Sequence, residues 1–267
     1  MFMDPLAPLI TALHTEGRLR VWSLVITAFG DLVQHRGGRI STARLGLLLG
    51  RVGVEPGTLR TALSRLGRDG WVESERKGRT SFYRLSAQGL DRFAPATTRI
   101  YGSPRTSPVN RWAITLSLTA NGAPDICITP ADESPDIADC RVTGDLNNVS
   151  DAYRATLLDP AHRAALAALA NDLAALEPEL TDPLDAAAAR LLLIHRWRRI
   201  VLRFPDLAPE LLPRNVALPN ARLSVAQAYL RLIPATEEWL GSPIAGQSAM
   251  PAADQQFAHR FGGGYKA

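Results

Sequence analysis

The sequence predicts a multidomain α+β protein with an N-terminal winged helix-turn-helix, a small central module of strands and an α-helical C-terminal domain. Three observations predict this architecture. Helical patterns and a hairpin pattern fill the first hundred residues, a stretch rich in Gly and Pro covers 101–108, and Ala/Leu-rich helical runs follow residue 159. We place the domains at 1–101, 102–152 and 153–267, because a length of 267 residues accommodates several domains.

Two helices are predicted at the start of the chain. Leu6–His14 has an amphipathic pattern, and apolar residues crowd one broad face from Leu19 to Gln34. The pair Gly37-Gly38 ends the second pattern, because glycine is a poor helix former. The broad apolar face indicates that the second helix is buried.

A short helix, a tight turn and a longer helix follow. Ser41 or Thr42 can cap the N-terminus of a helix over 43–52. Pro56 suits the first position of the next helix, which is expected to run to Asp69. Two helices joined by a short turn are typical of a helix-turn-helix.

A hairpin and another helix complete the N-terminal third. Trp71–Glu75 and Ser81–Leu85 are rich in aromatic and β-favouring residues, which predicts two strands joined by the turn Arg76-Lys77-Gly78-Arg79. A helix from Ser86 to Arg99 is expected to follow. Helices followed by a hairpin in this order predict a winged helix.

The helix over 56–69 has two contrasting faces. Its apolar residues recur at helical spacing and form an inward stripe, whereas the opposite face carries hydroxyl and guanidinium groups. Arginine binds guanine edges and phosphates, and short hydroxyl side chains allow a close approach to DNA. The predicted DNA contacts on this helix are Thr58, Arg60, Thr61, Ser64, Arg65 and Arg68. Arg60 is the first candidate for a base contact, and a solvated helix face is the alternative.

The turn of the hairpin is also basic. Arg76, Lys77 and Arg79 surround Gly78 and place positive charges on a thin loop that can reach the DNA backbone or the minor groove. These residues are predicted to add affinity more than sequence specificity. A turn that is basic for solubility is the alternative.

Charge is distributed unevenly along the chain. Residues 1–101 hold 15 Lys and Arg against 8 Asp and Glu, residues 102–190 hold 6 against 13, and residues 191–267 hold 9 against 5. A basic N-terminal third beside an acidic middle is expected if one end of the protein binds a polyanion. Double-stranded DNA is therefore the predicted partner.

The central module is predicted to contain short strands at Arg111–Leu118, Ile126–Thr129 and Cys140–Val142. Cys127 and Cys140 are the only cysteines, which is too few for a disulfide framework. We expect both cysteines either to be buried or to have no functional role.

The C-terminal domain is predicted from helix start signals. Asp159-Pro160 and Asp182-Pro183 each place a capping side chain before a proline at the first helical turn. A last helix is expected from Ser224, with Pro234 kinking or dividing it.

Several specific motifs occur at both ends of the chain, namely Gly37–Ile40, Leu59–Leu66, Gly70–Arg79, Tyr83–Leu85, Ile100–Gly102 and Leu193–Arg199. With these motifs the sequence resembles the PaaX family, repressors of bacterial phenylacetic acid degradation. The resemblance implies an N-terminal winged helix, a central ferredoxin-like module similar to Cas2 and a C-terminal helical domain. It also implies a homodimeric repressor of a catabolic operon that is released by an aryl-acyl-CoA, with phenylacetyl-CoA the familiar inducer.

The central module departs from this family pattern. Family members carry an Arg-rich helix after the strand that begins at Arg111-Trp112, whereas here Leu118 passes almost directly to Gly122. We therefore expect an abbreviated central module. This departure weakens the inference that the chain shares the family's inducer and the contacts of the family's central module. It leaves the N-terminal prediction of DNA binding unchanged.

A second basic cluster lies near residue 200. His195, Arg198 and Arg199 are predicted effector-binding residues, because arginines can hold the phosphates of a CoA-type effector while apolar neighbours receive its acyl group. In the alternative interpretation Trp197 belongs to the core, and the arginines pair with acidic residues such as Asp182 and Asp185.

The sequence contains no Gly-x-Ser-x-Gly, phosphate-binding Gly loop or His-Glu-x-x-His motif. We therefore expect no enzyme, no cofactor and no metal site. One alternative is a Cas2-like metal-dependent nuclease that uses Asp125, Asp132 or Asp136, and another is a non-enzymatic scaffold that binds nucleic acid. No apolar stretch reaches the roughly 18 residues of a membrane helix, so a cytoplasmic location is expected.

The predicted mechanism is a homodimer that places two 56–69 helices in successive major grooves of a near-palindromic operator. Repression is expected to follow from occlusion of the promoter. An effector bound in the C-terminal two-thirds is expected to change the spacing of the two helices and thereby lower the affinity for the operator.

Overall fold

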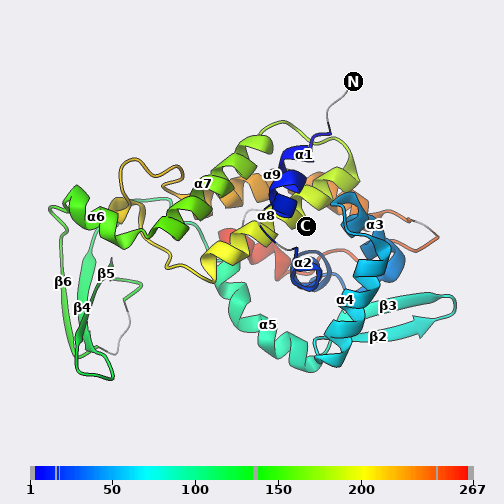
Figure 1. Ribbon diagram of the computed structural model, residues 1–267, viewed down its shortest axis with the longest axis horizontal. Helices are drawn as coiled ribbons and strands as arrows, with labels where there is room; N and C mark the ends of the chain where they lie inside the picture. The colour runs from blue at the N-terminus through cyan, green and yellow to red at the C-terminus, as the bar shows by residue number, and fades with distance from the viewer. Residues whose placement is uncertain (1–3, 16, 18, 135–137, 245, 264–267) are drawn as a thin grey trace.

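The structure is a computed structural model that describes residues 4–15, 17, 19–134, 138–244 and 246–263. The chain combines helices with two small antiparallel sheets, and these elements extend along one axis (Figure 1). The sheet of β4 (Trp112–Leu118), β5 (Pro124–Pro130) and β6 (Cys140–Gly144) lies at one end of the molecule and the hairpin of β2 (Val72–Lys77) and β3 (Thr80–Leu85) at the other, with helices between them.

The first two predicted helices are confirmed as α1 (Ala7–Thr15) and α2 (Val21–Ala28). The last part of the second pattern is a π-helix, Phe29–Val33, which continues α2. The chain then forms β1 (Arg39–Ser41), a strand that the sequence analysis did not predict. Three residues are too few for a period-2 pattern, and β1 exists because it pairs with a strand more than forty residues away.

The two helices of the predicted helix-turn-helix are confirmed as α3 (Thr42–Arg51) and α4 (Pro56–Arg68). Ser41 rather than Thr42 is the cap of α3, because its hydroxyl accepts a hydrogen bond from the backbone N–H of Arg44 at 3.2 Å. Gly53 in the connecting turn has a φ of +84°, a left-handed conformation that favours glycine.

The predicted hairpin is confirmed as β2 (Val72–Lys77) and β3 (Thr80–Leu85), and the sheet has the order β1-β3-β2. Both strands are longer than predicted. Lys77 pairs directly with Thr80, so Arg76 and Lys77 belong to β2 and only Gly78-Arg79 forms the turn. A φ of +62° at Gly78 is compatible with such a two-residue turn.

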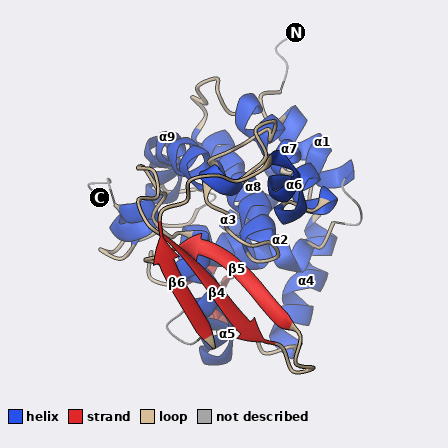
Figure 2. Cartoon of the chain, turned by 90° about the vertical axis from the view of Figure 1, so that its left-hand side faces the viewer, coloured by secondary structure: helices blue, strands red, loops and turns tan. Residues whose placement is uncertain are grey.

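The predicted helix after the hairpin is confirmed as α5 (Ala87–Ile100), which Ser86 caps. The central module follows as β4 (Trp112–Leu118), β5 (Pro124–Pro130) and β6 (Cys140–Gly144), in the sheet order β5-β4-β6 (Figure 2). The connection from β4 to β5 is a turn without a helix, as the abbreviated module predicts.

Of the two alternatives expected for the cysteines, burial is wrong, because both are exposed. Cys127 lies on β5 and Cys140 on β6, the two edge strands that flank β4. Trp112, at one end of the sheet, belongs to a small cluster with Ala208 and Leu211. Most residues of the two edge strands are exposed.

The C-terminal part is helical, with α6 (Asp151–Leu157), α7 (Pro160–Ala175), α8 (Pro183–Val201) and α9 (Ala221–Gly241). The predicted caps are confirmed, because the side chains of Asp159 and Asp182 accept hydrogen bonds from the first turns of α7 and α8. Pro234 lies inside α9 and does not divide it. Packing of both halves of α9 into the core keeps the helix continuous.

One hydrophobic cluster includes side chains from both the first hundred and the last hundred residues. Helix α8 is at its centre, since Ala186–His195 is buried without interruption and α8 contacts α2, α3, α5, α7 and α9. The predicted domain boundaries stay a prediction. Among the described residues no helix is both long and apolar enough to cross a membrane.

Candidate DNA interface and the cleft beside it

Helix α4 has the two faces that its sequence predicts. Leu59, Ala62, Leu63 and Leu66 are buried against the core. The side chains that the sequence analysis assigned to DNA are all exposed, and they are Thr58, Arg60, Thr61, Ser64, Arg65 and Arg68. The amphipathic packing of α4 therefore leaves this polar and cationic face available to a partner.

The exposed face of α4 has two sides. Thr58, Thr61 and Arg65 recur at positions i, i+3 and i+7 and share one side, whereas Arg60 lies toward the other. Asp69 is the acidic residue closest to this face in sequence, and its carboxylate is 3.5 Å from Nε of Arg65. An exposed ion pair of this kind is worth at most about 1 kcal/mol, so it does not prevent Arg65 from contacting a phosphate.

The hairpin carries its predicted cations in exposed positions near its turn, and its strand β2 contacts α4. Arg76, Lys77 and Arg79 are exposed, and Nε of Arg76 donates a hydrogen bond to the carbonyl oxygen of Gly78 at 3.2 Å. Sequence reasoning missed Arg39, which β1 places next to the hairpin. Its guanidinium lies 5.4 Å from the ring centroid of Phe82 on β3.

A cleft of about 1300 Å³ lies between α4, the start of α2, α7 and the C-terminal part of α8. Thr58, Thr61 and Arg65 form part of its lining, and so do His195 and Arg199 of α8. The cleft thus brings together three residues predicted for DNA and two predicted for an effector, although about 130 positions separate the two sets.

The lining of this cleft is strongly basic. Five arginines contribute to it, and they are Arg20, Arg65, Arg196, Arg199 and Arg203. Among its described lining residues there is no Asp or Glu. Arg196 forms a partly buried ion pair with Asp172 of α7, a residue outside the lining. The concave surface is therefore suited to an anion with several negative charges.

His195 is a neutral member of the cleft wall. Its side chain is buried, and its Nδ1 lies 3.0 Å from the hydroxyl of Thr27 on α2. Burial, reinforced by the charges of Arg198, Arg199 and Arg196, lowers the pKa of His195 from 6.5 to about 3. At neutral pH this imidazole therefore adds a polar group and no positive charge to the cleft.

Arg198, the third residue predicted for the effector, is directed to another part of the molecule. Its guanidinium donates hydrogen bonds to the carbonyl oxygen of Ser23 at 3.1 Å and to the hydroxyl of Thr27 at 2.9 Å. Burial lowers the pKa of Arg198 from its ordinary value. The side chain joins α8 to α2 and is not part of the described cleft lining.

The alternative interpretation of the basic cluster is confirmed for its tryptophan and for one arginine, because Arg196 pairs with Asp172 of the acidic middle segment. Trp197 is buried, and its indole N–H donates to the carbonyl oxygen of Ile100 at 2.8 Å. The acidic partners expected for the arginines have other roles, because Asp182 caps α8 and Asp185 accepts a hydrogen bond from Arg51 at 2.5 Å. These contacts depend on how helices cross, which a local pattern does not contain.

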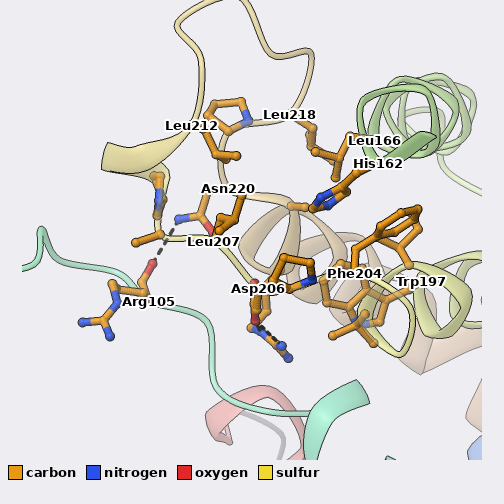
Figure 3. A pocket seen from close by; sticks show the side chains of 18 of the residues that line it. Arg105, His162, Leu166, Trp197, Phe204, Asp206, Leu207, Leu212, Leu218 and Asn220 are labelled. Carbon is orange, nitrogen blue, oxygen red and sulfur yellow. Dashed lines mark hydrogen bonds and ion pairs between the residues drawn. The ribbon is translucent and has the colours of Figure 1, made fainter. Parts of the chain in front are cut away.

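A smaller cavity of about 80 Å³ adjoins the cleft (Figure 3). Ile200 and Phe204 line both spaces. The ring of His162 stacks on Phe204 with centroids 4.5 Å apart, and burial lowers the pKa of this histidine. The wall of this smaller cavity also contains Asn220, whose side-chain amide donates a hydrogen bond to the carbonyl oxygen of Arg105 at 3.0 Å. Sequence reasoning missed this cavity, because its residues come from distant segments.

Two of the three aspartates considered for a nuclease lie within the described residues. Asp125 is exposed on β5, and the carboxylate of Asp132 is 3.5 Å from the guanidinium of Arg105. Asp136 lies outside the described residues. No group of three or more His, Cys, Asp or Glu side chains within the described ranges is arranged to hold a metal ion.

Two family models match separate segments of the chain. A model described as PaaX-like protein matches residues 20–89, and a model described as PaaX-like protein C-terminal domain matches residues 145–242. The first segment contains the exposed face of α4 and the hairpin, and the second contains α7, α8 and the C-terminal wall of the cleft. Strands β4 to β6 lie between the two segments.

Individual relatives were also found. The transcriptional repressor PaaX of Escherichia coli strain K12 is 31% identical in an alignment of 286 residues that covers 90% of each chain. An uncharacterized protein from Mycobacterium tuberculosis, of known structure, is 18% identical, with a TM-score of 0.47 and coverage of 81% of this chain and 97% of the other.

Proposed function

The chain belongs to the PaaX-like family, and from this premise we propose that it is a DNA-binding transcriptional repressor. The reading unit is a winged helix-turn-helix in which α4 enters the major groove and the β2–β3 hairpin is the wing. The shortened central sheet takes the place of the Cas2-like module. The regulated genes belong to a catabolic operon, such as one for phenylacetate degradation.

A single observation carries the proposal. Every cation and hydroxyl that the sequence assigned to DNA on α4 and on the hairpin is exposed, while the apolar stripe of α4 is buried. The two elements are in contact, and both expose positive charges. A helix with arginine and short hydroxyl side chains supplies both base and phosphate contacts, and a basic wing adds phosphate contacts.

The proposed repressor is a homodimer, and one face of the central sheet supports this part of the proposal. Ile114 on β4 lies opposite Ile128 on β5 and Val142 on β6, so these apolar side chains share one face. Ile126 and Val142 are 59% and 60% exposed. Exposed apolar area of this kind marks an interaction site, and a second copy of the chain is the proposed occupant.

The proposed effector is an acyl-CoA thioester such as phenylacetyl-CoA, and its proposed site is the basic cleft. Arg199 can pair with its phosphate groups, and His195 offers a neutral polar contact beside them. Arg198 is left out of the proposed contacts, because its guanidinium already donates to Ser23 and Thr27.

The experiment that tests the function is binding of the purified protein to its own promoter fragment and to a scrambled duplex of equal length. The measurement is repeated over a salt series, with and without phenylacetyl-CoA. We expect a salt-dependent preference for the promoter that the thioester reduces. Equal affinity for both duplexes at every salt concentration would overturn the assignment as a sequence-specific repressor.

A further inference from the structure

We infer that a phosphorylated ligand in the basic cleft excludes DNA directly, because the ligand and the DNA need the same side of α4. The inference rests on the proposed function and concerns how the effector acts. In this mechanism the ligand and the DNA compete for one subunit, instead of the ligand changing the spacing of the two α4 helices in a dimer.

The charge of the cleft identifies the polar part of the ligand. Arg20 precedes α2 and Arg203 follows α8, and both are exposed. Within the described residues neither forms an ion pair with a carboxylate. Arg65 adds a third guanidinium from α4. Guanidinium groups that converge from different elements are suited to phosphate groups, and the exposed pair of Arg65 with Asp69 is too weak to prevent such a contact.

The apolar part of the lining indicates that the ligand is more than a phosphate. Trp22 and Leu19 lie in the cleft near the start of α2, and α7 contributes a smooth wall of alanines. Phe204 lies at the border with the smaller cavity, where His162 stacks on it (Figure 3). An amphipathic molecule can therefore place its phosphates on the arginines and its apolar group toward Phe204.

The overlap with DNA follows from the position of α4 in the wall. Thr58, Thr61 and Arg65 lie on one side of the exposed face of α4, and all three line the cleft. A helix in the major groove has a sugar-phosphate strand along each side. A ligand that fills the cleft therefore covers the side of α4 that one of these strands would approach.

Competition and allostery make different quantitative predictions. If ligand and DNA exclude each other, the apparent Kd for DNA rises in proportion to the ligand concentration without an upper limit. If both bind at once, the apparent Kd reaches a plateau at the coupling factor, typically about 5-fold to 150-fold. A mechanism in which the ligand changes the distance between the two α4 helices of a dimer requires a duplex with two half-sites. Direct exclusion also weakens binding to a duplex with one half-site.

The experiment measures fluorescence anisotropy of labelled promoter and half-site duplexes at a series of fixed phenylacetyl-CoA concentrations, with coenzyme A as a second probe. We expect a proportional rise of the apparent Kd on both duplexes. A plateau on the promoter, or a half-site duplex that does not respond, would overturn the inference.

Variants locate the site independently of DNA. Arg203→Ala is expected to weaken phenylacetyl-CoA binding about tenfold in calorimetry, since it removes a charge-assisted contact. Arg214→Ala is the matched control, because Arg214 is an exposed arginine outside the cleft, and it should leave the affinity unchanged. Equal effects of the two substitutions would show that the cleft is not the ligand site.

The failure of this inference can be told apart from the failure of the proposed function. If the protein without ligand binds the promoter no better than the scrambled duplex, the proposed function as a sequence-specific repressor is contradicted. If the protein prefers the promoter but its apparent Kd for DNA reaches a plateau with ligand, only the inference of competition in the cleft is contradicted. The same holds if the protein binds neither phenylacetyl-CoA nor coenzyme A.

Discussion

Asp31 and Arg190 are joined by a buried hydrogen bond of 2.9 Å between Oδ2 and Nε, although 159 positions separate them in the chain. Arg260 and the hydroxyl of Tyr229 also donate to the carboxylate of Asp31. Burial alone would raise the pKa of Asp31, but the charges of Arg190 and Arg260 lower it below its ordinary value. The cluster attaches the N-terminal helices to α8, α9 and the C-terminal segment.

Removing the carboxylate of this cluster is expected to be strongly destabilising. Asp31→Ala leaves two buried guanidinium groups without their shared anion, which should cost about 3–5 kcal/mol of unfolding free energy. Urea unfolding monitored by circular dichroism measures the loss. The exposed pair of Glu73 and Arg84 provides the control, and Glu73→Ala should cost less than about 1 kcal/mol. Similar losses for both variants would contradict the importance of the buried cluster.

A methyl group at Gly30 is expected to disrupt the contact between the π-helix and α5. A Cβ built on Gly30 would lie 2.0 Å from Cζ of Phe93, so either the ring or the backbone must move. Gly30→Ala should lower the unfolding free energy by about 1–3 kcal/mol. At Gly46 in α3 a Cβ meets no atom within 4 Å, and Gly46→Ala should stabilise the protein by about 0.5–1 kcal/mol. The melting temperatures of the two variants should therefore shift in opposite directions.

Because His195 is buried and neutral, we predict that the free energy of unfolding decreases as the pH falls. Its pKa is about 3 in the folded protein and near 6.5 in the unfolded chain, so between these values the unfolded state binds the additional proton. The stabilisation is complete above pH 6.5 and is lost as the pH falls toward 3, with a slope of up to about 1.4 kcal/mol per pH unit.

Urea unfolding between pH 4 and pH 8 measures this slope. His195→Gln can keep the hydrogen bond to Thr27 and cannot be protonated in this range, so it should reduce the slope. His259→Gln changes an exposed histidine and serves as the control. An unchanged slope in His195→Gln would contradict the prediction.

A charge on the apolar face of the central sheet is expected to dissociate the proposed dimer. Ile126→Asp places a carboxylate among Ile114, Leu116 and Val142, and sedimentation should then detect a monomer. Thr143→Asp adds the same charge to an exposed residue whose register places it on the opposite face, and it should leave the dimer intact. A dimer that survives Ile126→Asp would assign the interface to another surface.

The helix and the wing are expected to contribute differently to DNA binding. Arg60→Ala should cost about 1–3 kcal/mol and relax sequence preference at one operator position. Lys77→Ala should weaken binding to all sequences alike and reduce the slope of affinity against salt. Competition assays with single-base operator variants measure the difference. Equal losses on specific and random DNA for both variants would contradict this division of roles.

Features that depend on local interactions could be predicted from the sequence. The inward stripe of α4, the caps at Asp159 and Asp182 and the β2–β3 hairpin follow from side-chain periodicity and from hydrogen bonds within a few residues. The exposed cations of α4 were found in the same way, because a residue opposite a buried stripe must face away from the core.

The tertiary structure alone decided which distant residues meet. Asp31 contacts Arg190, Arg199 and Thr58 line the same cleft, and β1 exists only through its pairing with β3. Each of these relationships depends on how helices and strands cross, and sequence spacing carries no information about that. The sequence by itself determined a basic, exposed face on α4, whereas the packing of α8 against the N-terminal helices determined that a basic cleft lies beside it, since only packing brings distant side chains to one surface.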